Sequence, residues 1–130
     1  MKNKIFAVLA LSSLIWTDAY SAQHVSSGKL MEYPEFHSKF IAPRTVCVWV
    51  PEGYSKSKKY DVLYMHDGQM LFDAATTWNK QEWKVDEIAG QLMQEEKIRQ
   101  CIVVGVSNIP ETRYGDFLPQ KLLQYLPGGT

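Results

Sequence analysis

The segment around which this chain is built reads YDVLYMHDGQMLFD, residues 60–73. Its apolar run, Val62 to Met65, predicts a strand that is buried on both faces, as central strands of parallel sheets are. Gly68 permits backbone angles that are closed to other residues, so we expect the chain to turn sharply out of the sheet there. Because open α/β sheets bind ligands at the carboxyl ends of their strands, this turn is the first candidate for a functional site.

The segment after the turn, residues 67–82, is long for a connection between a strand and a helix. Such connections usually take about 2–6 residues, and much longer ones tend to be functional. We therefore expect this loop to form a wall of an active site.

Residues 83–99 follow a helical pattern, with Trp83 expected on the apolar face that contacts the core and Lys97 and Arg99 near the end, where they match the helix dipole. Residues 101–107 then have the composition of a second buried strand. Residues 61–107 therefore predict a strand, a helix and a strand joined by a right-handed parallel crossover. The segment 108–119 should leave the same edge of the sheet as the first loop.

Two further strand patterns precede this unit. Alternating apolar and polar residues on either side of Pro34 predict one or two half-exposed edge strands, because proline is tolerated at an edge rather than in the centre of a sheet. The segment 44–50 is rich in β-branched and aromatic residues and predicts a strong strand. We find no internal repeat and no linker that would divide the chain.

The N-terminal residues have the pattern of an export signal. Lys2 and Lys4 precede an apolar run from Ile5 to Trp16, and small residues follow, which predicts a secretory signal peptide over residues 1–21. The apolar run is shorter than a typical membrane-spanning helix. We therefore expect a periplasmic or secreted protein that has no membrane association once the signal is removed.

The composition narrows the classes of function. The chain has 130 residues, 45% of them hydrophobic and 22% charged, which is ordinary for one globular domain. Signal removal takes away two of 14 basic and one of 14 acidic residues, and the resulting charge near −1 argues against nucleic acid as a partner. The sequence has no phosphate-binding loop, paired catalytic carboxylates or metal-ligand spacing, so we expect neither a metal nor a cofactor.

Four stretches of the chain carry a resemblance to a known family: VWVPEGY (48–54), YMHDGQMLFD (64–73), EWKVDE (82–87) and GVSN (105–108). They resemble the family named Putative esterase, which groups α/β-hydrolases similar to esterase D, feruloyl esterases and enterochelin esterases. The resemblance covers about residues 44–126. One departure is Met70, where many relatives have Asn.

The resemblance implies an incomplete α/β-hydrolase fold, with an antiparallel edge, a parallel pair of strands and one crossover helix. Residues 22–130 would be the N-terminal part of the esterase domain. The strand that contains Cys47 would lie antiparallel beside the strand that begins at Cys101. Cys47 would then lie nearer Gly105 than Cys101, too far for a disulfide given a limit of about 7 Å between Cα atoms. We therefore expect two buried free thiols.

In α/β-hydrolases the loop after the third strand supplies one backbone N–H to the oxyanion hole. By position, the resemblance implies that Gln69 is this donor. A set of further residues on the two loops are candidate pocket residues: His66, Asp67, Gly68, Met70, Trp78, Asn108, Arg113 and Tyr114.

The family's nucleophile is a serine in Gly-x-Ser-x-Gly, followed in the chain by an acid and a histidine. The pentapeptide does not occur here, so we expect Ser107 to be structural. We also expect structural or surface roles for His24, His37 and His66. The chain resembles the N-terminal part of a longer serine esterase that stops before the nucleophile, and we expect these 130 residues alone to be inactive. The implied substrates are small-molecule or polysaccharide-linked esters, such as feruloyl, acetyl or siderophore esters.

Two other functions stay open. Asp67 at the end of a strand could accept a phosphoryl group, although Gln69 stands where a second acid usually lies, and we favour an Asp67 that braces the turn through its own backbone hydrogen bonds. A non-catalytic carbohydrate-binding or interaction module could use Trp78, Trp83, Tyr114 and Phe117 as stacking surfaces. The sequence does not specify an oligomeric state.

Overall fold

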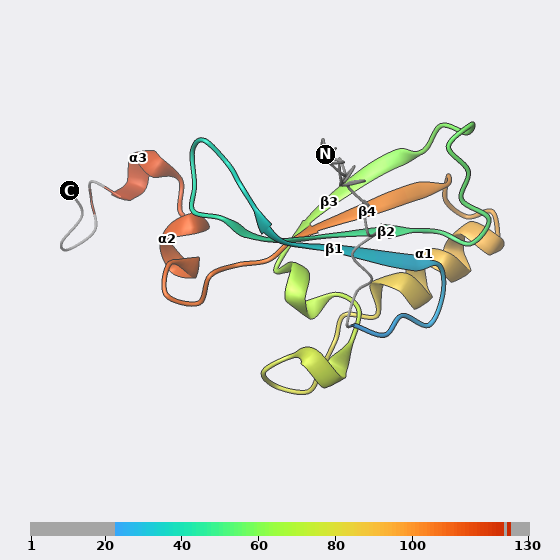
Figure 1. Cartoon of the computed structure of the whole chain (residues 1–130), viewed down its shortest axis with the longest axis horizontal. Helices are drawn as coiled ribbons and strands as arrows, with labels where there is room; N and C mark the ends of the chain where they lie inside the picture. Colours follow the sequence, from blue (N-terminus) through green and yellow to red (C-terminus); the bar gives the residue numbers. More distant parts are fainter. Residues whose placement is uncertain (1–22, 124, 126–130) are drawn as a thin grey trace, which may run out of the picture.

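The computed structural model describes residues 23–123 and 125, and the predicted signal peptide lies outside these residues. Four strands form one mixed sheet in the order β1-β2-β4-β3 (Figure 1). The strands are β1 (Lys29–Phe36), β2 (Arg44–Val50), β3 (Asp61–His66) and β4 (Cys101–Val106). The helices are η1 (Gly68–Met70), η2 (Ala74–Thr76), α1 (Val85–Gln94), α2 (Arg113–Asp116) and α3 (Gln120–Leu123), of which η1 and η2 are 3₁₀ helices.

The strand pairing confirms the predicted topology. β3 and β4 are parallel and are joined through α1, whereas β2 is antiparallel to both β1 and β4. Cys47 lies opposite Gly105, and both cysteines are free thiols, as expected. Burial, with a smaller contribution from the charge of Glu32, raises the pKa of Cys47 to about 12.

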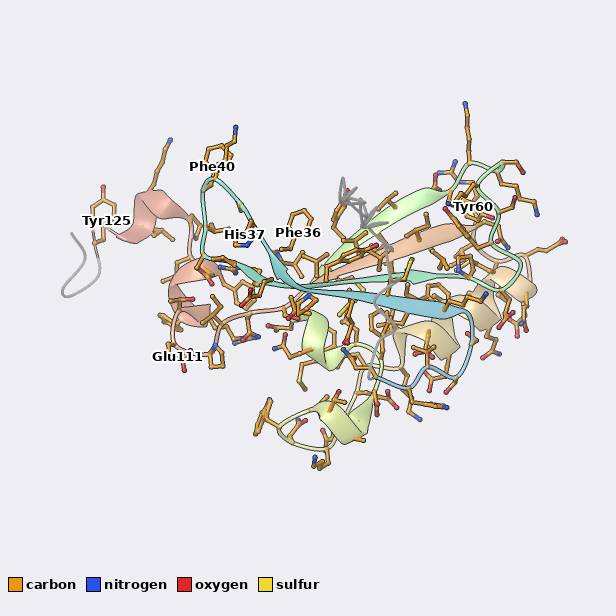
Figure 2. All side chains as sticks on the ribbon, viewed as in Figure 1. Phe36, His37, Phe40, Tyr60, Glu111 and Tyr125 are labelled. Carbon is orange, nitrogen blue, oxygen red and sulfur yellow. The ribbon has the colours of Figure 1, made fainter. Side chains whose placement is uncertain are left out.

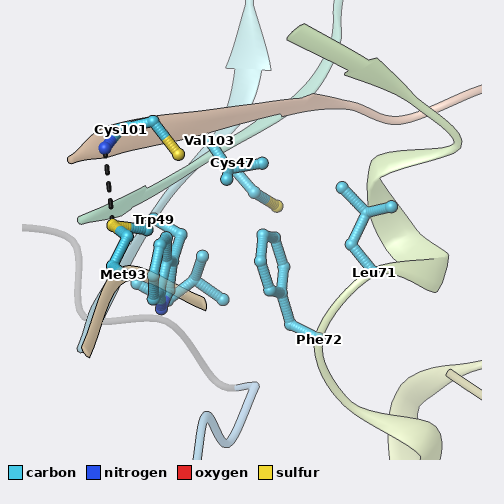
Figure 3. Packing of buried hydrophobic residues seen from close by; sticks show 8 residues of the cluster. Cys47, Trp49, Leu71, Phe72, Met93, Cys101 and Val103 are labelled. Carbon is cyan, nitrogen blue, oxygen red and sulfur yellow. Dashed lines mark hydrogen bonds between the residues drawn. The ribbon is translucent and has the colours of Figure 1, made fainter. Parts of the chain in front are cut away.

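The core lies on the face of the sheet that α1 covers (Figures 1 and 3). It contains side chains from β1, β2 and β4, from α1 and from the segment after η1: Leu30, Cys47, Trp49, Leu71, Phe72, Met93, Cys101 and Val103. Burial alternates strictly along β4, and this alternation places Cys101 and Val103 in the core. Leu71 and Phe72 belong to the long loop after β3 and are 0% and 2% exposed, so this part of the loop packs in the core and does not line a cleft.

The expectation that β3 is buried on both faces is wrong. Val62, Leu63 and Tyr64 are 49%, 47% and 73% exposed. Within the described residues β3 lies at the edge of the sheet and pairs with β4 alone. An apolar run indicates which faces suit burial, but the neighbouring elements determine whether they are covered.

The start and the end of α1 also differ from the prediction. Trp83 precedes the helix and is 48% exposed, because its N–H donates to Met70 O (2.9 Å) and the next residue, Lys84, is left-handed with φ 56°. The helix ends at Gln94. Lys97 and Arg99 therefore lie beyond the last turn, and the predicted interaction with the helix dipole is not formed. Lys97 pairs instead with Glu95 (2.6 Å).

At the other edge, β1 is a single strand whose pairing with β2 is irregular between Tyr33 and Phe36, on either side of Pro34. The predicted edge position of Pro34 is confirmed. Figure 2 shows Phe36 at the end of β1 and His37 and Phe40 along the connection to β2, and Phe40 is 93% exposed. None of the helices in the described part of the chain has the length and apolar character needed to cross a bilayer.

Candidate active site at the carboxyl ends of β3 and β4

The turn after β3 has a different construction from the one expected. Its left-handed residue is Asp67 (φ 54°, ψ 44°), and Gly68 does not have a positive φ. Aspartate tolerates this conformation better than most residues because its short polar side chain can be hydrogen-bonded nearby. Gly68 is required for a steric reason, since a Cβ at this position would lie 2.8 Å from the carbonyl carbon of Gly105 in β4.

The Asp67 carboxylate is buried and bound on both oxygens. Arg113 donates from Nε to Oδ1 (3.0 Å) and from Nη2 to Oδ2 (2.6 Å), and Asn108 Nδ2 also donates to Oδ1. The Asp67 side chain is 7% exposed and that of Arg113 is 50% exposed. The hydrogen bonds from Arg113 lower the pKa of Asp67 below its ordinary value, despite the opposing effect of burial.

These contacts correct one prediction about Asp67. Its side chain does not cap the turn by bonding its own backbone, because both oxygens are directed to residues of the loop after β4. A phosphoryl-accepting aspartate acts as a nucleophile, and the Arg113 guanidinium and the Asn108 amide, which donate to the two oxygens of Asp67, make this carboxylate less nucleophilic. The geometry therefore disfavours the phosphotransfer function.

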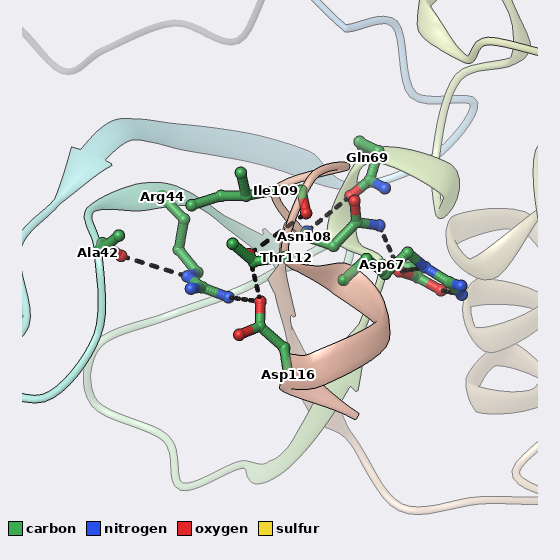
Figure 4. Close-up of polar contacts among 9 residues, drawn as sticks. Ala42, Arg44, Asp67, Gln69, Asn108, Ile109, Thr112 and Asp116 are labelled. Carbon is green, nitrogen blue, oxygen red and sulfur yellow. Dashed lines mark hydrogen bonds and ion pairs between the residues drawn. The ribbon is translucent and has the colours of Figure 1, made fainter. Parts of the chain in front are cut away.

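A second contact ties the same two loops together. The backbone N–H of Asn108 donates to Gln69 Oε1 (3.2 Å), as Figure 4 shows. Met70 N donates to Asp67 O (2.8 Å), which closes the turn. Among the described residues, no acceptor receives the N–H of Gln69. The side chain of Gln69 is thus engaged while its backbone donor is not.

Arg113 is also held from its other side. Its guanidinium carbon lies 4.7 Å from the centre of the Phe117 ring, and this ring contacts the His66 ring edge to face at 5.1 Å. The helix that carries Arg113, α2, is anchored to β2 by an ion pair between Arg44 and Asp116 (3.2 Å; Figure 4). The predicted loop 108–119 therefore contains a short helix that presents Arg113 to Asp67.

The structure brings together most of the candidate residues proposed from the sequence. His66, Asp67, Gly68, Gln69, Asn108 and Arg113 form one contact network, which we call the Asp67 cluster, completed by Phe117 and by the close approach of Gly105. Two candidates lie apart from it, since Trp78 and Tyr114 are 85% and 77% exposed, and Met70 joins it through its backbone alone, with N–H donating to Asp67 O and its side chain buried. From the sequence, Phe117 is predicted only as a stacking surface of a binding module. Its position four residues after Arg113 is the spacing at which side chains meet on a helix.

Other features of the described residues lie away from this cluster or lack its chemistry. A surface hollow lined by Met93 and residues 96–100 is at the connection from α1 to β4, the opposite end of β4. Within residues 23–123 and 125, no three His, Cys, Asp or Glu side chains are grouped so that they could hold a metal ion. Ser107 is buried, and its N–H donates to Thr45 O (2.9 Å), consistent with a structural role.

The family model described as Putative esterase matches residues 38–127, which is most of the chain. The chain belongs to this esterase family. The resemblance noted in the sequence is thereby confirmed, and the strands and crossover helix are part of an α/β-hydrolase fold.

Solved structures similar to this esterase-family chain include two feruloyl esterases. The ferulic acid esterase AmCE1/Fae1A from the anaerobic fungus Anaeromyces mucronatus is 22% identical, with a TM-score of 0.47 over 69% of this chain and 32% of that one. A mutant feruloyl esterase module from Clostridium thermocellum, solved with sinapinate, is 22% identical, with a TM-score of 0.45 over 68% of this chain and 30% of that one. The chain thus spans about a third of the length of these structures.

Proposed function

We propose that this chain is the part of a carboxylic ester hydrolase that supplies one half of its oxyanion hole. The observation that carries the proposal is the turn after β3, where the N–H of Gln69 has no acceptor among the described residues while the turn itself is held by Asp67 and Met70. Membership of the esterase family supports the reaction class.

The proposed mechanism forms an acyl-enzyme on a serine. Attack on the ester carbonyl places negative charge on the former carbonyl oxygen, and a fixed N–H that awaits this charge stabilises the transition state. In this fold the second N–H comes from the residue after the nucleophile. Backbone donors suit the task because the turn orients them before the reaction begins.

The catalytic serine, acid and histidine of the proposal lie in polypeptide outside these 130 residues. The sequence supports this, because it contains no Gly-x-Ser-x-Gly. We further propose that the protein is exported with residues 1–21 as its signal peptide, and that its substrates are feruloyl, acetyl or related esters. The 130-residue chain by itself is then inactive.

The first experiment extends the coding sequence beyond Thr130 and expresses the longer protein. We expect a downstream Gly-x-Ser-x-Gly followed by Asp and His, and hydrolysis of an aryl acetate and of methyl ferulate by the longer protein. The 130-residue chain is the matched control and should hydrolyse neither ester. Turnover by this chain, or inactivity of the longer protein on a panel of acyl esters, would contradict the proposal.

The second experiment tests the donor itself. Gln69→Pro removes the backbone N–H, and we expect turnover to fall by about 10²–10³, as for loss of one oxyanion donor in a serine hydrolase. Gln69→Ala is the matched control, because it keeps the N–H and loses only the side-chain bond to Asn108. Equal activity of the two variants would exclude Gln69 as the donor.

A further inference from the structure

Gln69 is two residues from Asp67, and the conformation of Asp67 determines how the chain leaves β3. A positive φ is unfavourable for any residue that has a Cβ, so such a residue needs external contacts to hold it. The only side chains that hold the Asp67 carboxylate among the described residues are those of Arg113 and Asn108. On the other side of Gln69, Met70 is buried and bonded to Asp67 O.

The peptide that carries the Gln69 N–H is therefore fixed at both ends, and one of these ends depends on an arginine 46 residues away. We propose that Arg113, acting through Asp67, is a positioning residue that sets the direction of the Gln69 N–H in the esterase. This inference rests on the proposed function of Gln69. Arg113 does not donate to the oxyanion in this scheme.

Three contacts suit Arg113 to such a role. Its guanidinium binds both carboxylate oxygens of Asp67, and this fork fixes an orientation that a single donor cannot fix. The Phe117 ring stacks against it, and α2 is anchored to β2 through Arg44 and Asp116. The position of the turn after β3 therefore depends, through Arg113, on where α2 is held against β2.

The fork makes Arg113→Lys informative, because lysine keeps the positive charge but cannot bind both oxygens in one plane. The matched control is Arg99→Gln, since Arg99 pairs with Asp61 at the other end of β3 (2.8 Å) and lies outside the proposed site. Both arginines pair with an aspartate on or next to the same strand. A general effect of losing an Arg–Asp pair would appear in both variants.

The test measures kcat and KM in the longer esterase for Arg113→Gln, Arg113→Lys and Arg99→Gln. We expect Arg113→Gln to lower kcat by about 10- to 100-fold, the cost of a displacement near 1 Å, and to change KM less than about twofold. Arg113→Lys should lie between Arg113→Gln and the wild type, and Arg99→Gln should match the wild type. A rise in KM with unchanged kcat would mean that Arg113 binds substrate and would overturn the proposal.

The decisive comparison adds Gln69→Pro. If Arg113 acts through the Gln69 N–H, Arg113→Gln should cost less than about threefold in the Gln69→Pro background, because coupled residues are not additive. Multiplicative losses would overturn the inference. Amide hydrogen exchange at Met70, whose N–H donates to Asp67 O (2.8 Å), gives a readout that does not need activity, and we expect faster exchange in Arg113→Gln and no change in Arg99→Gln. If Arg113→Gln does not fold, Arg113→Lys decides the same questions.

The outcomes separate the inference from the function beneath it. An inactive wild type, or a Gln69→Pro variant as active as the wild type, contradicts the proposed function. An impaired Gln69→Pro together with an Arg113→Gln of normal kcat contradicts the role of Arg113 alone.

Discussion

The two ends of β3 carry the same kind of ion pair in different surroundings. At the amino end Asp61 pairs with Arg99 at 2.8 Å, and their side chains are 49% and 86% exposed. Just beyond the carboxyl end Asp67 pairs with Arg113 at 2.6 Å, with exposures of 7% and 50% and a further bond from Asn108. An exposed pair contributes little because water screens it, whereas an enclosed carboxylate depends on its partners.

The difference shows that residue type and distance alone do not identify a functional ion pair. The Asp61 pair joins the start of β3 to the segment before β4, far along the strand from the candidate site. The Asp67 pair holds a left-handed residue two positions before the proposed donor, Gln69. The expected effects of substitution at the two ends therefore differ, and they can be ranked.

The largest effect should come from Gly68→Ala, at the carboxyl end. The new Cβ would lie 2.8 Å from Gly105 C and 3.0 Å from Ser107 N, and neither backbone atom can move without displacing β4. We expect the free energy of unfolding to fall by about 1–3 kcal/mol, measured by urea denaturation. Gly115→Ala is the control, since a Cβ there meets nothing within 4 Å, and it should be neutral or slightly stabilising. Equal stability of Gly68→Ala and wild type would contradict the packing described.

The next effect should come from removing the charge at each end separately. Asp67→Asn leaves the Arg113 fork without its anionic partner, and we expect a loss of about 1 kcal/mol, moderated because water reaches Arg113. Asp61→Asn should cost no more than a few tenths of this amount. Urea denaturation at neutral pH measures both, and similar losses at the two ends would remove the distinction.

A smaller effect should appear when the pH is lowered. Because the folded pKa of Asp67 lies below its ordinary value of 3.8, this carboxylate stabilises the fold above the unfolded pKa, and the contribution is lost as the pH falls through the folded pKa. The difference in unfolding free energy between wild type and Asp67→Asn should stay constant from pH 7 to about pH 4.5 and shrink below it.

Asp86 titrates in the opposite sense, and its effect should cancel in this comparison. Burial raises its pKa, so its contribution to stability decreases as the pH rises through its folded pKa. Both proteins contain Asp86. A difference between wild type and Asp67→Asn that grows on acidification would contradict the assignment of Asp67.

The smallest effect should be that of Arg99→Gln. We expect a change in unfolding free energy below about 0.2 kcal/mol at low ionic strength, because both partners are exposed. The change should vanish near 1 M NaCl, where the Debye length is about 3 Å. A loss that persists in salt would mean that the Asp61 pair has a structural role after all.

The candidate site was predictable in its members but not in its contacts. Asp67, Asn108 and Arg113 follow the ends of two neighbouring parallel strands, and this arrangement alone predicts that they share an edge. That Arg113 binds Asp67, and that Trp78 and Tyr114 stay outside the cluster, depends on how α2 packs. A separation of 46 residues has no period from which a contact can be inferred.

The sequence by itself was sufficient to predict the strands, the crossover helix and the family, because hydrophobic periodicity and short motifs are properties of neighbouring residues. Three features depended on distant parts of the chain. β3 is exposed because no second described strand pairs with it, α1 starts at Val85 because Trp83 bonds to Met70, and Asp67 takes the left-handed position while Gly68 packs on Gly105. Burial, helix ends and turn geometry are set by contacts between elements, and a linear pattern does not contain them.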